Sequence, residues 1–225
     1  MLSPIAMPTT SHRFSPSLAR AAAACDTVFA DFDGARRVCA RDEEIYAEES
    51  AADFVYEVVE GVVRTCRLLS DGRRQIEDFY LPGDVFGLEA GLTRRATAEA
   101  LGPVTLKVVR RTTLSELATR DADLARKLWA LTARDLRRTQ DHLLMLGRRS
   151  ATERVAGFLL DLAERTDSED VLDLPMSRQD IADYLGLTIE TVSRTFTQLQ
   201  NTGLIEAPSC RRLIVDLEAL EDLCA

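Results

Sequence analysis

The spacing of hydrophobic residues divides the chain into a strand-rich first half and a helical second half. Between about residues 27 and 109, apolar and polar residues alternate in short runs separated by turn residues, which is typical of β-strands. From residue 121 to residue 149, leucines recur at intervals that suit the faces of a helix, and no Gly or Pro occurs before Gly147. This pattern predicts a compact β-domain that is followed by a long helix.

The strands predicted in the first half are short and regularly spaced. Hairpin turns are expected at Glu60-Gly61 and Asp71-Gly72, because Gly after an acidic residue favours a tight turn between strands. A loop, LPGDVFG, interrupts the pattern at residues 81–87. Many short strands at such spacing indicate a sandwich, a roll or a barrel. The predicted strands have the sequences TVFADF, EEIY, FVYEVV, VVRTCRLL, RRQIEDFY and VTLKVV.

The long helix is expected to contact two partners. At about 1.5 Å per residue it spans roughly 40 Å, which is more than a compact roll covers by itself. Its leucines form two slightly rotated stripes, which favours the β-domain on one side and the same helix of a second subunit on the other. A helix that covers only its own β-domain is the alternative. The stripes are Leu124, Leu128 and Leu131, and Leu136, Leu143 and Leu146.

Two short helices joined by a tight turn are predicted between residues 176 and 203. Ser177 precedes an apolar-periodic run and has Asp180 three residues further on, which resembles a capping box. Gly186 ends that run, and Thr188 can cap a second helix. This arrangement is typical of a helix-turn-helix. The expected inward positions of the second helix are Ile189, Val192, Phe196 and Leu199.

The start of the second helix carries a polar face. Glu190, Ser193 and Arg194 project together, because residues three and four apart share one side of a helix. Arg can bond guanine O6 and N7 at once, and Glu can accept a hydrogen bond from cytosine N4. Helix-turn-helix proteins touch base edges with this part of the helix, so the three residues are the predicted base-reading set. A purely structural helix-turn-helix is the alternative, although a packing helix would more often carry apolar residues there.

The segment after the second helix predicts a small hairpin and a last short helix. GLIEAPSCRRLIVD has the alternation of two strands, with Pro208 and Ser209 in the turn and Arg211 and Arg212 beside it. Asp216 can cap the final helix, LEALEDLC. A hairpin that directly follows a helix-turn-helix is the layout of a winged helix.

Net charge limits the DNA binding that can be expected. The formal charge of −9 opposes non-specific binding, which depends on basic side chains near phosphates. Residues 148–225 alone hold 8 Arg against 15 Asp plus Glu. Many of these acids lie in the DSED and EALED segments, away from the arginines of the helix-turn-helix and wing. Because the local potential at the docking face matters most, we expect DNA binding with modest non-specific affinity.

Composition indicates a cytoplasmic protein with no membrane partner. The hydrophobic fraction of 46% is ample for a core, and no apolar run is long enough for a membrane span. The N-terminus lacks the charged-then-apolar order of a signal peptide. Five scattered cysteines without a CxxC pair, together with His12 and His142, support neither a disulfide framework nor a zinc site. No GxSxG, HExxH or Walker lysine motif occurs, which argues against an enzyme.

The element order and two motifs resemble the CRP/FNR superfamily of bacterial transcription regulators. LPGDVFGLEAGL resembles the family's roll segment, and LTIETVSR resembles the FNR-type recognition helix with its ExxSR pattern. CRP-type members generally have glycine where this chain has Ser193, and the FixK-type branch of FNR-like activators is the most similar. The resemblance covers about residue 25 to the end and implies an α+β fold. Its parts are an antiparallel β-roll of the cyclic-nucleotide-binding jelly-roll type (25–120), a dimerisation helix (121–149) and a winged helix-turn-helix (150–225). Before them, the sequence pattern predicts an N-terminal tail and a short Ala-rich helix (1–24).

This resemblance implies an activator that binds double-stranded DNA as a homodimer, at an inverted repeat of the TTGA...TCAA kind. Twofold symmetry places the two recognition helices about one DNA turn apart. By the same resemblance, Gly83 and Asp84 match a roll loop that contacts RNA polymerase, and low-oxygen, nitrogen-fixation or respiratory genes are suggested as targets. The candidates for DNA-backbone contacts are Arg178, Thr188, Thr191, Arg211 and Arg212.

Departures from the family indicate a regulator without a cofactor. FNR-type oxygen sensors hold an iron-sulfur cluster with closely spaced N-terminal cysteines, whereas Cys25 stands alone here. Cyclic-AMP binders hold the ribose with a glutamate, but Leu88 occupies that position and Glu89 follows one place late, although the segment RRAT at 94–97 retains an arginine. Neither histidine falls on a predicted roll strand, where a haem ligand would be needed. A regulator controlled by a cyclic nucleotide or by haem is the alternative.

Two further residues lead to hypotheses about regulation. Asp183, on the first helix of the helix-turn-helix, is expected either to face solvent or to repel DNA phosphate and weaken binding. Cys210 lies beside Arg211 and Arg212, whose charges favour a thiolate, so it is a candidate for redox modulation; an unreactive wing residue is the alternative. Cys39 and Cys66 fall in strand patterns and are expected in the core.

Overall fold

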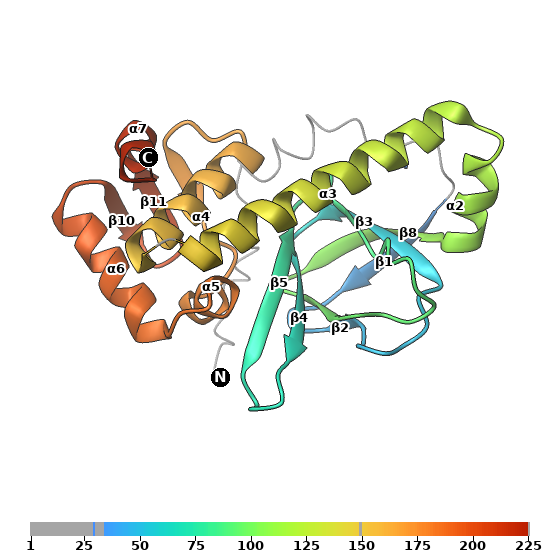
Figure 1. Ribbon diagram of the computed structural model, residues 1–225, viewed down its shortest axis with the longest axis horizontal. Helices are drawn as coiled ribbons and strands as arrows, with labels where there is room; N and C mark the ends of the chain where they lie inside the picture. The colour runs from blue at the N-terminus through green and yellow to red at the C-terminus, as the bar shows by residue number, and fades with distance from the viewer. Residues whose placement is uncertain (1–28, 30–33, 149, 225) are drawn as a thin grey trace, which may run out of the picture.

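A β-roll, a long helix and a C-terminal domain follow one another along the chain. The computed structural model describes residue 29 and residues 34–148 and 150–224, so the predicted tail at residues 1–24 lies outside the described residues. Figure 1 shows the long helix running across the molecule, with the roll below its right-hand part and the C-terminal domain around its left-hand end. Among the described helices, none is long and apolar enough to cross a membrane.

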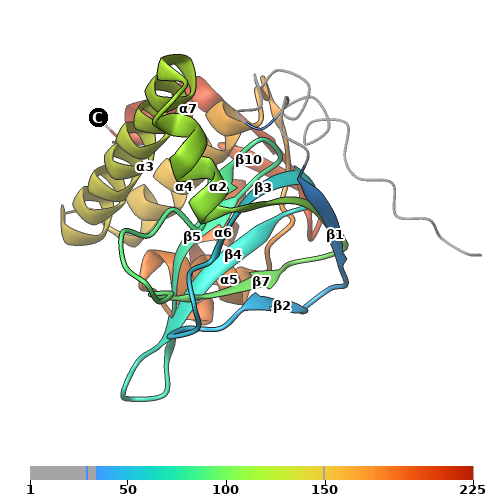
Figure 2. The ribbon, with the colours of Figure 1, turned by 90° about the vertical axis from the view of Figure 1, so that its right-hand side faces the viewer.

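The roll consists of two antiparallel four-stranded sheets. One has the strand order β1-β8-β3-β6 and the other β2-β7-β4-β5. Figure 2 looks onto this roll, with α2 and α3 along one side of it. Inward side chains such as Val58, Phe86 and Leu106 are buried between the sheets. The strands are β1 (Ala35–Cys39), β2 (Glu44–Tyr46), β3 (Phe54–Glu60), β4 (Val63–Leu68), β5 (Arg74–Tyr80), β6 (Val85–Phe86), β7 (Thr97–Ala100) and β8 (Val104–Arg110).

Turns and short strands of the roll differ in part from the prediction. Asp71-Gly72 closes the β4–β5 hairpin, as expected, with Gly72 at a positive φ. Glu60-Gly61 closes no hairpin, because it takes the chain from β3 in one sheet to β4 in the other. The pattern does not predict β1, β6 or β7, which have only two to five residues and therefore show little periodicity. Of the predicted strand TVFADF, only Phe29 is described, and it is buried.

The first half of the long helix packs on the roll. α2 (Arg111–Ala118) leads into α3 (Ala122–Arg148), which lies where the sequence predicts it. Leu124 is buried in a cluster with side chains of β3 and β8, and Leu128 and Leu131 pack against that cluster. One leucine stripe therefore faces the helix's own β-domain, as expected.

From Trp129 onward, α3 presents an open apolar side. Leu136 and Leu143 are 59% and 63% exposed, and Trp129 is exposed as well. Leu146 does not share this side, because it is half-buried with a methyl group close to Gly186 of the helix-turn-helix. The grouping of Leu146 with the outer stripe is therefore wrong, since the C-terminal domain covers the end of the helix.

The C-terminal domain packs helices against a small antiparallel sheet. Capping boxes begin α4 at Ser150 and α5 at Ser177, and Thr188 caps α6, so both caps predicted in the helix-turn-helix are present. The sheet order β10-β11-β9 adds a third strand, from the loop after α4, to the predicted hairpin. The elements are α4 (Ala151–Arg165), β9 (Val171–Asp173), α5 (Arg178–Leu185), α6 (Ile189–Asn201), β10 (Ile205–Ser209), β11 (Arg212–Val215) and α7 (Leu217–Cys224).

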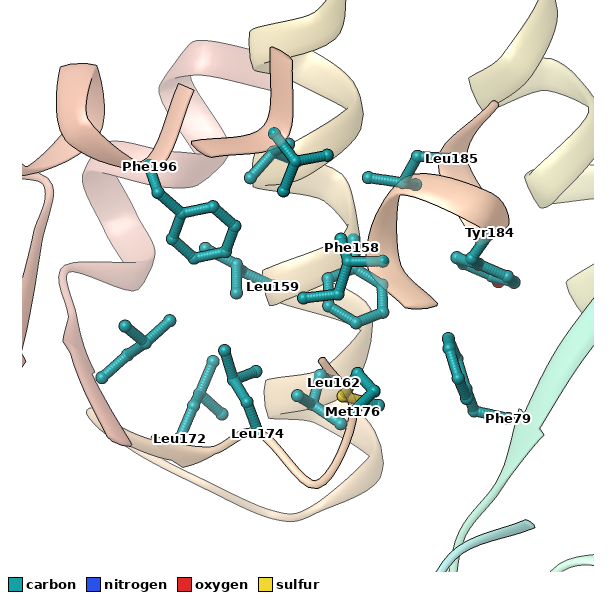
Figure 3. Close-up of a cluster of buried hydrophobic side chains, with 14 of the residues drawn as sticks. Phe79, Phe158, Leu159, Leu162, Leu172, Leu174, Met176, Tyr184, Leu185 and Phe196 are labelled. Carbon is teal, nitrogen blue, oxygen red and sulfur yellow. The ribbon is translucent and has the colours of Figure 1, made fainter. Parts of the chain in front are cut away.

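One hydrophobic core joins the C-terminal domain to the roll. Phe79 of β5 lies with its ring centroid 6.3 Å from that of Phe158 on α4 and 5.2 Å from that of Tyr184 on α5. Figure 3 shows Phe79 extending from the roll strand toward Tyr184, with the leucines of the C-terminal domain beyond them. Ile76 and Leu81 of the roll are buried in the same cluster. The two domains therefore share apolar surface and stabilise each other.

An ionic cluster beside this core ties the roll to α3 and α4. Arg165 of α4 donates to the backbone carbonyl of Phe79 at 2.6 Å and to the Asp84 carboxylate at 2.7 Å. Arg138 of α3 donates to the Asp78 carboxylate at 2.6 Å. The side chains of Asp78, Asp84 and Arg165 are largely buried, so removing one partner would leave an uncompensated charge in the joint.

Gly83 and Asp84 therefore do not lie where the family resemblance puts them. Gly83 is buried, and its amide donates to the carbonyl of Val58 at 2.8 Å. The side chain of Asp84 is only 16% exposed and, besides binding Arg165, accepts from the amide of Leu81. The expectation that this loop is presented to RNA polymerase is wrong, because Gly83 is buried and the Asp84 carboxylate is held in the joint between the domains.

We expect Phe79→Ala to lower the free energy of unfolding by about 3–5 kcal/mol, because it removes a buried aromatic side chain from the shared core. Leu68→Ala, on the neighbouring strand, is the control and should change it by about 0.5 kcal/mol or less, since Leu68 is exposed. Urea unfolding followed by far-ultraviolet circular dichroism measures both. Equal losses for the two variants would contradict the shared core.

Candidate nucleic-acid interface

The turn between α5 and α6 sets the geometry of the helix-turn-helix. Gly186 adopts a left-handed conformation with φ +62°, which ends α5 and which a residue with a Cβ rarely adopts. Thr188 then accepts a hydrogen bond from the amide of Thr191 at 3.2 Å and begins α6. Residues 186–188 are thus the whole connection between the two helices, which keeps the start of α6 at the surface.

The three predicted base-reading residues lie together on the exposed side of α6. Glu190, Ser193 and Arg194 are all exposed at the first turns of the helix. The pKa of the Glu190 carboxyl lies below its ordinary value, mainly because it accepts from its own backbone amide, and also because of the Thr188 hydroxyl and the Arg194 charge. The face therefore offers an ionised acceptor, a hydroxyl and a guanidinium to the same region of solvent.

The apolar side of α6 differs from the prediction at one position. Val192, Phe196 and Leu199 are buried, as expected, but Ile189 is 37% exposed. Thr195 is buried in addition. Ile189 is the first residue of the helix, so no preceding turn covers it, and its predicted inward position is wrong.

The polar face extends further along α6 than the predicted set. A shallow hollow of about 420 Å³ is lined by Ser193 and Arg194 and continues along the helix. Its other lining residues lie three, four, seven and eight positions beyond Arg194, so the helical spacing that predicts the base-reading set could also have found them. They are Thr197, Gln198, Asn201 and Thr202.

The DNA-backbone candidates on the helices are partly engaged within the domain. The guanidinium of Arg178 lies over the ring of Phe196, 3.3 Å from its centroid. Burial lowers the pKa of Arg178 to about 10, which still leaves it charged at neutral pH. The hydroxyls of Thr188 and Thr191 lie 3.1 Å apart at the start of α6, where the helix dipole favours an anion.

The wing turn lies two residues further along the chain than predicted. Pro208 and Ser209 belong to β10, and the turn consists of Cys210 and Arg211. Cys210 and the two arginines beside it are exposed, and Arg212 lies 3.7 Å from the Asp173 carboxylate. Cys39 and Cys66 are buried in the roll, as expected.

Asp183 faces the roll instead of solvent or DNA. Its carboxylate accepts from Arg74 of β5 at 2.8 Å and from Gln179 at 2.6 Å, and its side chain is only 13% exposed. The expectation of a solvent-facing acid is wrong, because periodicity within α5 does not reveal which neighbour covers it. The pairing with Arg74 also removes the basis for repulsion of DNA phosphate by this residue.

A pocket of about 550 Å³ lies between the roll and α3, but Arg94, the arginine retained in the segment RRAT, does not line it. Arg94 is buried and donates to the Glu89 carboxylate at 2.6 Å and to backbone carbonyls of Gly87 and Phe54. Its guanidinium also lies over the ring of Tyr46, 4.1 Å from the centroid. An arginine held in this way is not free for a phosphate, so these residues do not fit a cyclic nucleotide.

Two family models match the parts that the geometry separates. Residues 36–121 match the cyclic nucleotide-binding domain, and residues 153–223 match the Crp-like helix-turn-helix domain. The first match covers the roll and α2, and the second covers the helix-turn-helix together with its wing. The predicted α+β fold with roll, long helix and winged helix-turn-helix is thereby confirmed.

The chain is also similar to named regulators over most of its length. It is 52% identical to the nitrogen fixation regulation protein FixK of Azorhizobium caulinodans over 84% of this chain and 79% of that one, and 49% identical to FixK of Rhizobium meliloti over 80% and 83%. The solved structure of FixK2 from Bradyrhizobium japonicum shares 48% identity, with a TM-score of 0.82 over 85% of this chain and 98% of that one. These relatives are transcription regulators, not enzymes. The chain belongs to the CRP/FNR family of transcription regulators, in its FixK-type branch.

Proposed function

We propose that this protein is a transcription activator that binds an inverted-repeat DNA site of the TTGA...TCAA kind as a homodimer. The observation that carries the proposal is the exposed row of Glu190, Ser193 and Arg194 at the start of α6. The single G·C pair of a TTGA half-site offers guanine to an arginine and the N4 amino group of cytosine to an ionised glutamate. The low pKa of Glu190 keeps it in the accepting form at neutral pH.

A homodimer is supported by the open side of α3. The exposed residues on that side follow one another at alternating intervals of four and three positions, which is the repeat of a two-stranded coiled coil. The apolar members, Trp129, Leu136 and Leu143, lie one heptad apart. Exposure of such an apolar stripe to water is unfavourable in free energy. We therefore propose that the same helix of a second subunit covers it. The full repeat is Trp129, Ala133, Leu136, Gln140, Leu143 and Gly147.

We infer that DNA binding requires no small-molecule cofactor. The support is the roll interior, where Arg94 already has Glu89 and Tyr46 as partners. Control by a cyclic nucleotide or by haem is the second candidate function, and the match to the cyclic nucleotide-binding domain is the observation in its favour.

The regulated genes and the signal are inferred from relatives. FixK of Azorhizobium caulinodans is a nitrogen fixation regulation protein, so we propose nitrogen-fixation or low-oxygen genes as targets. Activation implies contact with RNA polymerase, which surface residues other than Gly83 and Asp84 must provide. Redox modulation through Cys210 stays a prediction, supported by the exposure of that thiol in the wing.

We expect Arg194→Ala to weaken binding to the specific site by about 1–3 kcal/mol and to relax the preference at the G·C pair, because a bidentate base contact is lost. Arg211→Ala is the control for a phosphate contact. It should weaken all sequences alike and lower the slope of log affinity against log salt by about 1. Fluorescence anisotropy with matched and mutated half-sites measures both; an unchanged specificity ratio in Arg194→Ala contradicts direct reading.

We expect Leu136→Asp to convert the dimer to monomers, because it places a charge in the centre of the apolar stripe. Leu92→Asp is the matched control: Leu92 is an exposed leucine in a roll loop, far from the stripe in sequence, and its variant should stay dimeric. Sedimentation velocity reads the state directly. A dimer of unchanged stability in Leu136→Asp would rule out this side of α3 as the interface.

We expect the purified protein to bind the inverted repeat without additives, and cyclic AMP or cyclic GMP to leave its affinity unchanged, because Arg94 is already engaged. Titration calorimetry with each nucleotide and a visible absorption spectrum provide the measurement. Saturable heat, or a haem absorption band, would establish the ligand-controlled alternative instead.

A further inference from the structure

The first helix of the helix-turn-helix is bonded to the roll by two arginines. Arg74 of β5 donates to Asp180 at 2.7 Å and to Asp183 at 2.8 Å, and Arg64 of β4 donates to Asp180 at 2.8 Å. We call Arg64, Arg74, Asp180 and Asp183 the α5 clamp. Arg64 also pairs with Glu99 of β7 at 2.7 Å, which anchors the arginine in its own sheet.

Asp180 is the centre of the α5 clamp. Its side chain is 6% exposed, and besides the two arginines it accepts from the backbone amide and the hydroxyl of Ser177, which caps α5. Burial alone would raise the pKa of Asp180, but the bonds from Ser177 and the charges of the arginines lower it below its ordinary value. The carboxylate that completes the capping box of α5 is therefore the same one that bonds α5 to the roll.

The α5 clamp acts on the orientation of the C-terminal domain, which the covalent chain restricts little. The C-terminal domain follows α3 through one short connection, so its rotation about that connection is fixed by non-covalent contacts. The shared core of Phe79, Phe158 and Tyr184 holds the domains together but is weakly directional. The directional bonds of Arg165 hold α4 to the roll and make no contact with α5. Charge-assisted bonds have narrow geometry, and these join α5 to strands β4 and β5. They can therefore set the angle of α5, and with it the angle of α6.

We propose that Arg64 and Arg74 are positioning residues that, through Asp180 and Asp183, set the spacing between half-sites that the dimer accepts. This inference rests on the proposed binding to an inverted repeat. One base pair more or less between half-sites shifts the second by about 3.4 Å and turns it by about 35°. A recognition helix held rigidly to the roll cannot follow that change, whereas a loosened one can.

The test compares binding of the full-length protein to inverted repeats whose spacer is optimal, one base pair shorter or one base pair longer. The variants are Arg74→Ala and the double variant Arg74→Ala/Asp183→Ala, which removes opposite charges together. Arg73→Ala is the matched control, because Arg73 is on the same hairpin but pairs with Asp71 in the turn. Hydrogen exchange of the α5 amides, measured without DNA, keeps the test independent of the DNA site.

We expect both Arg74 variants to lower the penalty for a changed spacer by about three- to tenfold, while base preference within the half-site is kept. Exchange over residues 178–185 should be faster than in Arg73→Ala. A spacer penalty equal to that of the wild type in both variants overturns the inference, as does equal relaxation in Arg73→Ala. If the wild type binds no inverted repeat, the proposed function fails. Hydrogen exchange then tests the α5 clamp by itself: faster exchange in the Arg74 variants supports it, and unchanged exchange overturns it.

Discussion

The packing of α5 against strand β5 is the contact on which the rest of the molecule depends. Phe79 and Tyr184 form its apolar centre, and Arg74 of β5 pairs with Asp180 of α5 across it. Arg165 of α4 adds an ion pair with Asp84, in the loop after β5. Hydrophobic contact supplies most of the favourable free energy, whereas the buried ion pairs specify geometry. Because this contact joins the roll to the C-terminal domain, the exposed face of α6 has a defined direction relative to α3.

The placement of charge explains how an acidic protein can read DNA. Many arginines are used inside the molecule, where each has a carboxylate partner; the clearest cases are Arg64, Arg74, Arg94, Arg138 and Arg165. They contribute little to the surface potential that attracts phosphate. In the function proposed above, discrimination between sequences depends mainly on the few polar side chains at the start of α6. This division of roles agrees with the low non-specific affinity expected from a formal charge of −9.

Local signals in the sequence predict the elements that contain them. The cap at Ser177, the glycine at 186 and the cap at Thr188 each act within a few residues, and all three are observed. Periodicity fails where an element is very short, as in β6 with two residues, or at a helix end, as at Ile189. The turn at Glu60-Gly61 is correctly placed, but whether it closes a hairpin depends on strand pairings elsewhere in the roll.

By itself the sequence determined the order of the domains, the family and the exposed row of Glu190, Ser193 and Arg194, because helical spacing and capping are properties of neighbouring residues. The tertiary structure alone decided what Asp183, Arg94 and Asp84 do. Asp183 meets Arg74 from 109 positions away, and Asp84 meets Arg165 from 81. A periodic pattern shows that a side of a helix is polar, but only the packed chain shows whether water, DNA or another part of the protein lies against it.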